Sequence, residues 1–320
     1  MKPDVLLLKA ILPDTIQALE ECFTVHRLDQ AKDRNALLAA VGPVIRAVVV
    51  GGQAPAGSEL FAQLPALEII ANFGVGYDTI DVASARRHGA IVTNTPDVLT
   101  EEVADLALGL LLAVVRRIPQ ADRYLRAEAW PKAAFPLSAS LRERRIGILG
   151  LGRIGRAVAR RLEGFGSAIA YHGRNRQKDV AYTYHATAIE LAQACDVLVV
   201  VAPGGGAEAL VNAEVLAALG PDGILINVAR GSLVDEAALI VALQQGVIHS
   251  AGLDVFADEP RVPSALIALD NVVLLPHVGS ASHHTRRAMG RLLVDNLVSW
   301  FAGRGPVTPV SETPWLPSAG

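Results

Sequence analysis

The stretch RRIGILGLGRIGRAVARRLEGFGSAIAYHGRNRQ, residues 144–177, decides the fold. An apolar strand runs into a turn with Gly150, Gly152 and Gly155, which leads to a helix rich in Ala and Arg and then to a second apolar strand. The first glycine permits a tight turn, the second lets the backbone approach a pyrophosphate, and the third allows close helix-to-strand packing. The helix N-terminus stabilises phosphate charge. The alternative is that the glycines serve only a tight turn, but the surrounding elements favour a dinucleotide site.

The end of the second strand indicates which dinucleotide is bound. A carboxylate there would accept hydrogen bonds from the ribose hydroxyls and repel a 2′-phosphate, but residues 173–176 are Gly-Arg-Asn-Arg, and the first acid is Asp179. Arg174 and Arg176 offer planar donors to a phosphate, and Asn175 offers a further donor. The sequence therefore favours NADP(H), with NAD(H) bound more weakly. Under the alternative interpretation both arginines are merely solvated.

Short apolar runs alternate with helix-like segments on both sides of this stretch, which is typical of parallel sheets covered on both faces. The runs are DVLLLKA, IRAVVVGG, LEIIANFGVGYD and AIVTNTP before it, and DVLVVVAP, GILINVAR, HSAGLDVF and NVVLLPHVG after it. We expect an α/β protein with two Rossmann-like or flavodoxin-like parallel-sheet domains. Residues 99–285 form the dinucleotide-binding domain. Residues 1–98 and 286–320 form a discontinuous first domain, completed by the last helix, with residues 306–320 as an irregular tail.

Residues 100–127 predict one long helix, with Thr100 as N-cap and acids in its first turn. Its apolar part, residues 106–115, is too short for a membrane span, which needs about 18 residues. We expect it to be buried or to lie at a subunit interface.

Bulk composition excludes several classes of partner. The chain has 320 residues, 51% of them hydrophobic, and a net charge of −3, which gives no reason to expect a nucleic acid or an anionic membrane as partner. The only two cysteines, Cys22 and Cys195, lack metal-ligand spacing and suit a reducing compartment. The N-terminus lacks the features of a signal peptide, so we expect a cytoplasmic protein.

Three polar side chains follow apolar strands and are candidates for chemistry: Arg230, Glu259 and His277. The carboxyl ends of strands in such a sheet face the ligand crevice, so these residues can converge. A carboxylate beside a histidine stabilises the imidazolium and favours proton donation, and an arginine can hold a carboxylate with two hydrogen bonds. Taken singly, each residue also has an ordinary structural explanation. His283 and His284 invite a metal site with His277, but no carboxylate or cysteine completes the set, and we expect no metal.

The chain resembles the D-isomer-specific 2-hydroxyacid dehydrogenase family, within it the glyoxylate and hydroxypyruvate reductase branch. The resemblance covers nearly the whole chain and is carried by NFGVGYDTID, VTNTPDVLTEEVADLALGLLLAVVRRI, GILGLGRIG, YHGRNR, INVARGSLVDE, AGLDVFADEP and LLPHVGSAS. It implies that Arg230 binds substrate and that Glu259 is the partner of His277, which acts as acid and base. It also implies that the Val75 and Gly76 amides bind the substrate carboxylate and that Asp254 holds the nicotinamide carboxamide.

The resemblance further implies a set of cofactor contacts. They are Thr100, Val103, Gly150, Leu151, Gly152, Arg153, Ile154, Gly155, Gly173, Arg174, Asn175, Arg176, Ala202, Pro203, Val228, Ala229, Arg230, Asp254, His277 and Gly279. Residues 200–212, VVAPGGGAEALVN, depart from the threonine-bearing pattern frequent in the family, which puts the contacts after Pro203 in doubt.

The resemblance implies an NADPH-preferring reductase of small 2-oxoacids, with glyoxylate and hydroxypyruvate first. 2-Ketogluconate and aromatic pyruvates are alternatives, and a nucleotide-sensing corepressor-like binding protein is an alternative of another class. It also implies a homodimer through residues 101–126, and closure of the two domains around the cofactor.

Overall fold

The computed structural model describes residues 2–206 and 208–315, which divide into two compact units. The first combines the chain up to Leu99 with the chain from Ser282 onward, and the second is Thr100–Ala281. The second boundary lies a few residues before the expected residue 285, because the Ser282 hydroxyl accepts the N–H of Thr285 and caps the last helix. The cap therefore belongs to the same unit as its helix.

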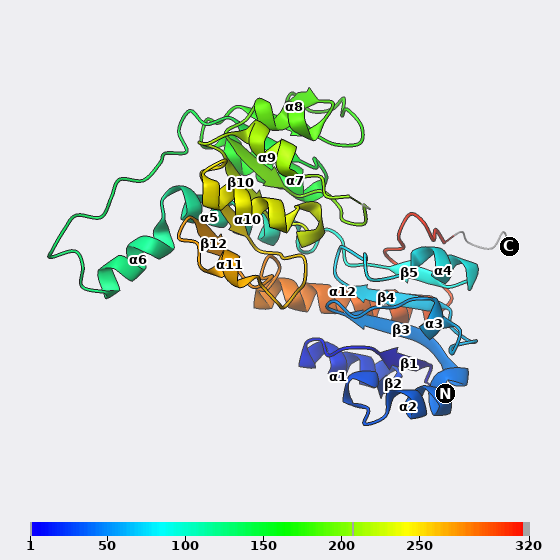
Figure 1. The fold of residues 1–320 in the computed structure, drawn as a ribbon. Coiled ribbons are helices and arrows are strands. Elements are labelled where there is room, and N and C mark those ends of the chain that lie inside the picture. Colours follow the sequence, from blue (N-terminus) through cyan, green and yellow to red (C-terminus); the bar gives the residue numbers. More distant parts are fainter. Residues whose placement is uncertain (1, 207, 316–320) are drawn as a thin grey trace. The chain divides into compact units, whose positions relative to one another are not determined.

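The first unit is built on a five-stranded parallel sheet of order β2-β1-β3-β4-β5 (Figure 1). Its strands are β1 (Asp4–Leu7), β2 (Thr24–Arg27), β3 (Ile45–Gly51), β4 (Ile69–Phe73) and β5 (Ile91–Thr93). Its helices are α1 (Pro13–Cys22), α2 (Arg34–Val41), α3 (Ser58–Phe61), α4 (Val82–Arg87) and α12 (His283–Phe301), with short 3₁₀ turns η1 (Leu28–Gln30) and η2 (Gly42–Val44). Helix α12 packs on α1 and β4, so the unit is assembled from both ends of the described chain.

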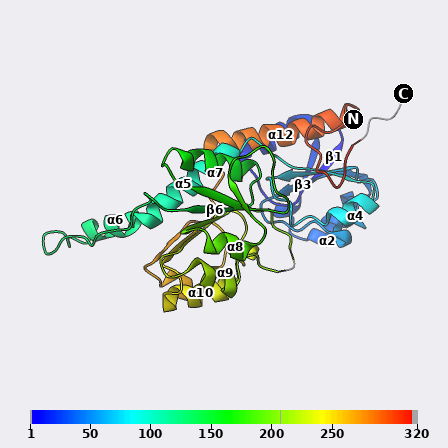
Figure 2. The ribbon, with the colours of Figure 1, turned by 90° about the horizontal axis from the view of Figure 1, so that it is seen from above.

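The second unit is built on a seven-stranded parallel sheet of order β12-β11-β10-β9-β6-β7-β8. Its strands are β6 (Ile146–Leu149), β7 (Ile169–His172), β8 (Thr183–His185), β9 (Val197–Val200), β10 (Ile224–Asn227), β11 (Ser250–Leu253) and β12 (Val272–Leu274). Its helices are α5 (Thr100–Val115), α6 (Ile118–Arg126), α7 (Arg153–Glu163), α8 (Ala188–Gln193), α9 (Ala213–Leu219), α10 (Glu236–Gln245) and α11 (Ser264–Ile267), with the 3₁₀ turn η3 (Gly231–Leu233). Helices α5 and α7 cover one face, and α8, α9 and α10 cover the other (Figure 2).

The central strands of both sheets are almost entirely buried, which explains why they appear in the sequence as continuous apolar runs. The predicted fold, two parallel-sheet α/β domains, is confirmed. Cys195 packs in the second core with its thiol beside Gly147, and burial raises the pKa of Cys195 to about 12. Cys22 is exposed at the end of α1, and both cysteines are unpaired.

The prediction of one long helix over residues 100–127 is wrong. Arg117 adopts a left-handed backbone conformation with φ of 53°, which ends α5 and starts α6 in a new direction. Pro119 in the first turn of α6 suits this break, because proline lacks the N–H that a continuing helix needs there. In Figures 1 and 2, α6 and the extended segment after it project away from the sheet of their own unit.

The tail predicted as irregular is bonded to strand β5 at several points. Pro309 forms an isolated antiparallel bridge with Thr93, and the N–H of Val310 donates to the carbonyl of Val92 at 2.9 Å. Residues 316–320 of this tail lie outside the described residues. Within the described ranges, no helix is long and apolar enough to cross a membrane.

Candidate active site

Apart from Thr100 and Val103, the sequence-predicted residues of the second unit follow six parallel strands at their carboxyl ends. Because the strands are parallel, these ends share one edge of the sheet. Strands β6 and β9 are neighbours although they are not consecutive, so the strand order reverses beside the glycine turn. Such a reversal is where open α/β sheets bind their ligands. The residues are 150–155 after β6, 173–176 after β7, 202–203 after β9, 228–230 after β10, Asp254 and Glu259 after β11, and His277 and Gly279 after β12.

The glycine turn has the geometry that a pyrophosphate site needs. Gly150 has φ of 104°, and a Cβ added there would lie 2.6 Å from the Cα of Ala202. A Cβ on Gly155 would lie 2.1 Å from the carbonyl oxygen of Gly150, so the start of α7 approaches the turn closely. Gly152, the N-cap of α7, faces open space and brings no side-chain cap. The first amides of α7 are therefore left for an anion, and the residues fit a dinucleotide phosphate.

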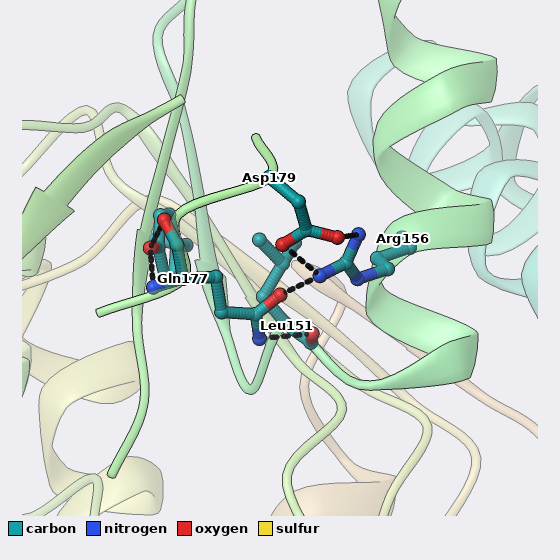
Figure 3. Close-up of polar contacts among 5 residues, drawn as sticks. Leu151, Arg156, Gln177 and Asp179 are labelled. Carbon is teal, nitrogen blue, oxygen red and sulfur yellow. Dashed lines mark hydrogen bonds and ion pairs between the residues drawn. The ribbon is translucent and has the colours of Figure 1, made fainter. Parts of the chain in front are cut away.

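The loop after β7 carries two exposed arginines, Arg174 and Arg176. Arg174, Asn175 and Arg176 are exposed, and within the described ranges neither arginine forms an ion pair or a hydrogen bond. The next acid in the sequence, Asp179, is held by Arg156 through two contacts of 2.8 Å, and this partner lowers the pKa of the Asp179 carboxyl (Figure 3). The arrangement fits a 2′-phosphate, because the two arginines have no competing carboxylate.

His277 and Glu259 are brought together by the loops after β12 and β11. The Nδ1 atom of His277 lies 2.7 Å from Oε2 of Glu259, and Oε1 of Glu259 accepts the N–H of Phe256 at 3.1 Å. The Glu259 side chain is 15% exposed and that of His277 38%. The carboxylate therefore orients the ring, while the opposite nitrogen, Nε2, is left for a ligand. This is an arrangement for donating and accepting a proton.

The backbone of His277 is held by Asp254, which is 1% exposed. Its carbonyl accepts the N–H of His277 at 2.8 Å, and its carboxylate accepts those of Val278 and Gly279 at 2.7 and 2.8 Å. Burial raises the pKa of Asp254, and the two amides oppose that rise. His277 itself has φ of 54°, a left-handed conformation rare for a residue with a side chain. Asp254 therefore fixes the turn that carries the histidine, and its contact with a nicotinamide carboxamide stays a prediction.

Arg230 begins the turn after β10, next to the loop that holds Glu259. The buried Asn227 side chain accepts the N–H of Ala229 and donates to the carbonyl of Arg230, which shapes this turn. A Cβ on Gly231 would lie 1.9 Å from the carbonyl carbon of Phe256, so only glycine permits this approach. The close contact sets the backbone of Arg230 beside the loop of Glu259. One Arg230 nitrogen, Nη1, donates to the carbonyl of Ala229 at 2.7 Å.

A cavity of about 310 Å³ opens beside the histidine and its carboxylate partner. Apart from these two side chains its lining is apolar. The lining residues are Phe256, Glu259, Pro260, Val262, Ile267, Leu274, Leu275, Pro276 and His277. The cavity therefore gives one side of the histidine an apolar neighbourhood.

In the first unit, the backbone carbonyls of the turn at Val75 and Gly76 accept hydrogen bonds from two asparagine side chains. The Asn72 side chain donates to the carbonyls of Gly74 and Gly76 at 3.1 and 3.0 Å, and that of Asn94 donates to Val75 at 2.8 Å. No described residue accepts a hydrogen bond from the amides of Val75 or Gly76. With its carbonyls bonded and these amides available, the turn is a candidate anion site for a carboxylate.

The remaining predicted positions have simpler surroundings. Thr100 is the first residue of α5, and Val103 is buried within 3.5 Å of the Cβ position of Gly279. His283 and His284 are exposed at the start of α12. Across residues 2–206 and 208–315, no group of three or more His, Cys, Asp or Glu is placed to hold a metal ion.

Comparison with known proteins supplies the family. Residues 108–279, more than half of the chain, match the model of the D-isomer specific 2-hydroxyacid dehydrogenase NAD binding domain. The chain belongs to the D-isomer specific 2-hydroxyacid dehydrogenase family. The match spans the glycine turn, Arg230, Glu259 and His277.

The similar proteins include reductases within this family. Glyoxylate/hydroxypyruvate reductase A HPR2 of Arabidopsis thaliana is 47% identical over 91% of this chain and 94% of its own length. Hydroxyphenylpyruvate reductase of Plectranthus scutellarioides is 47% identical over 92% of this chain and 94% of its own. The crystal structure of the NADPH-dependent glyoxylate/hydroxypyruvate reductase of Sinorhizobium meliloti, in complex with NADP and malonate, is 52% identical, covers all of both chains and has a TM-score of 0.94.

Several residues that shape the dehydrogenase site were not identified from the sequence. They are Asn72, Asn94, Arg156, Gln177, Asn227 and Gly231. Asn72 and Asn227 are each at or next to the last residue of a buried strand, where an asparagine that directs the following turn is a recognisable signal. For Arg156 and Gln177 there was no comparable signal, because their partners are distant in sequence.

Replacing Asn72 by Ala frees the carbonyls of Gly74 and Gly76 and loosens the candidate anion turn. Loss of a hydrogen bond is worth about 1 kcal/mol, so we expect KM for a 2-oxoacid to rise about fivefold to tenfold, with a smaller change in kcat. Steady-state kinetics test this, with Gln63→Ala as a control because Gln63 is exposed and donates only to the nearby carbonyl of Glu59. An unchanged KM would remove the turn from substrate binding.

Proposed function

We propose that this dehydrogenase is an NADPH-preferring reductase that converts small 2-oxoacids, glyoxylate and hydroxypyruvate first, to D-2-hydroxyacids. The observation that carries the proposal is the 2.7 Å contact between His277 and Glu259 at the sheet edge that also bears the glycine turn. The names of the similar proteins, including the NADPH-dependent reductase from Sinorhizobium meliloti, support the substrate class and the cofactor.

In this proposal each polar group acts on a defined part of the substrate. The bound cofactor supplies a hydride to the carbonyl carbon. His277 gives its proton to the carbonyl oxygen, and Glu259 stabilises the protonated ring before that transfer. Arg230 binds the substrate and polarises its carbonyl, and the amides of Val75 and Gly76 bind its carboxylate. In the oxidative direction the neutral imidazole takes the proton back.

The cofactor contacts are proposed in three groups. The backbone of residues 150–155 and the N-terminus of α7 bind the pyrophosphate. Residues 173–176 bind the ribose and its phosphate. The third group comprises Thr100, Val103, Ala202, Pro203, Val228, Ala229, Arg230, Asp254, His277 and Gly279.

Two alternatives lie within the same chemistry and one outside it. Aromatic pyruvates are supported by the hydroxyphenylpyruvate reductase of Plectranthus scutellarioides, and 2-ketogluconate is a further candidate substrate. The apolar cavity beside His277 favours testing aromatic substrates explicitly. A nucleotide-sensing binding protein would keep the dinucleotide site without turning over any 2-oxoacid.

We also propose a homodimer through the α5–α6 region. On the side of α5 turned away from its own sheet, Leu108 and Leu112 are half-buried and Gly109 is exposed. The projecting segment carries exposed apolar side chains, among them Trp130 at 66% and Leu137 at 99% exposure. Such a surface is typical of an interface with another chain. A cytoplasmic location completes the proposal, supported by the two unpaired cysteines.

Replacing His277 by Ala removes the proposed proton donor, and general acid catalysis typically contributes about 10²-fold to 10⁴-fold to a rate. We expect kcat to fall by that factor while NADPH still binds. The assay is NADPH absorbance decay with glyoxylate, hydroxypyruvate, 2-ketogluconate and aromatic pyruvates, repeated with NADH. His284→Ala, at an exposed histidine, serves as the control. Unchanged turnover in His277→Ala would refute the role of His277 as the acid. If the wild-type protein oxidised neither NADPH nor NADH with any of these substrates, the alternative of a nucleotide-sensing binding protein would be favoured.

Replacing Arg174 by Ala removes one proposed phosphate contact. A hydrogen bond to a charged group contributes about 1.5–3 kcal/mol, so the Kd of NADPH should rise about tenfold or more while that of NADH changes little. Titration calorimetry with both nucleotides measures this difference. Equal losses for the two nucleotides would contradict the phosphate assignment.

A charge on the outer side of α5 should break the proposed dimer. We expect the wild-type protein at twice its chain mass of 33.7 kDa and Leu112→Glu at the mass of one chain, by light scattering coupled to size exclusion. Val307→Glu adds the same charge at an exposed apolar residue of the other unit and should leave the mass unchanged. A wild-type monomer would refute the interface.

A further inference from the structure

The loop that carries Arg174 and Arg176 is tied at its end by Gln177. The backbone N–H of Gln177 donates to the Tyr171 hydroxyl at 2.7 Å, and its side-chain Nε2 donates to the carbonyl of Leu151 at 2.7 Å. Leu151 belongs to the glycine turn. A single side chain therefore joins the loop proposed for the ribose phosphate to the turn proposed for the pyrophosphate (Figure 3).

Arg156 of α7 completes this connection. Its guanidinium donates to Oε1 of Gln177 and makes a two-point contact with Asp179, with both nitrogen-to-oxygen distances 2.8 Å (Figure 3). The planar guanidinium suits such a fork, which fixes direction as well as distance. The amide of Gln177 is thereby held between Arg156 on one side and Leu151 on the other.

The network also controls charge around the loop. Between Gly173 and Asp179 the charged side chains are Arg174, Arg176, Lys178 and Asp179, so Asp179 is the single acid. A carboxylate free to turn toward the loop would pair with Arg174 or Arg176 and repel a phosphate. Arg156 prevents this because its fork occupies both oxygens of Asp179.

We propose that Arg156 and Gln177 are positioning residues that set the preference of this chain for the 2′-phosphorylated dinucleotide, Gln177 by fixing the loop against the glycine turn and Arg156 by holding Asp179 away from the loop arginines. The inference rests on the proposed NADPH preference. Neither residue needs to touch the phosphate, since each acts through the conformation and charge of residues 173–176.

The test is the pair of dissociation constants for NADPH and NADH in the full-length protein, measured by titration calorimetry. The Asp179 side chain is 68% exposed and that of Arg156 34%, and ion pairs near the surface contribute little individually. We therefore expect Arg156→Gln to raise the Kd of NADPH about threefold to tenfold and to leave that of NADH within about twofold. Gln177→Ala should act in the same direction. Arg160→Gln is the matched control: it lies one turn further along α7, and Arg160 pairs with Glu101 instead.

A double variant separates positioning from general stability. In Arg156→Gln/Asp179→Asn the released carboxylate is gone, so the affinity for NADPH should return toward that of the wild-type protein. Arg156→Lys, which keeps the charge and loses the fork, should lie between wild type and Arg156→Gln. Equal weakening of both nucleotides, or no recovery in the double variant, would overturn the proposal. If the wild-type protein bound NADPH no more tightly than NADH, the proposed NADPH preference itself would be refuted. The two wild-type Kd values show this before any variant is measured.

Discussion

The site depends on the parallel direction of seven strands. All strands of the second unit end at the same edge of the sheet. The direction of the strands is therefore enough to bring residues more than a hundred positions apart in sequence to that edge. The reversal of strand order between β6 and β9 then opens that edge beside the glycine turn. Arg230, Glu259 and His277 follow three neighbouring strands, β10, β11 and β12, so their proximity follows from the sheet order.

Buried polar side chains then determine the local backbone. The Asp254 carboxylate accepts hydrogen bonds from two backbone N–H groups in the turn of His277. The Asn227 side chain accepts the N–H of Ala229 and donates to the carbonyl of Arg230. The Asn72 side chain donates to the carbonyls of Gly74 and Gly76. A buried polar group left without a partner costs about 1–3 kcal/mol. The hydrogen bonds to these buried side chains therefore favour the observed conformation of each turn over others. The result is a set of functional groups placed by backbone hydrogen bonds.

Much of this architecture could be predicted because the responsible residues are close in sequence. The glycine turn, the apolar strands and the strand-end positions of His277 and Glu259 all have local signals. The edge strands β2 and β8 were missed because TVHR and TYH lack a continuous apolar run, as strands at a sheet edge often do. The break at Arg117 was missed because the apolar and charge pattern continues through it, and Pro119 was the only indication.

The site shows the same division between local and distant signals. The missing acid after β7 is visible in the sequence, but the pairing of Asp179 with Arg156 joins positions 23 residues apart on different elements. The close approach of Gly231 to Phe256 is of the same kind, since nothing near Gly231 in sequence indicates what lies against it. Such contacts depend on tertiary packing and cannot be obtained from periodicity.

The return of α12 to the first unit has a consequence for synthesis on the ribosome. The strands β1 to β5 emerge first, but the helix that covers them beside α1 follows only after the entire second unit has been made. Domains generally fold as units while the chain grows, so the dinucleotide-binding half can reach its native state before the first unit is complete. The earliest strands, buried in the finished protein, must wait with one face of their sheet only partly covered. Transiently exposed apolar strands favour aggregation, so this interval carries that risk for the nascent chain.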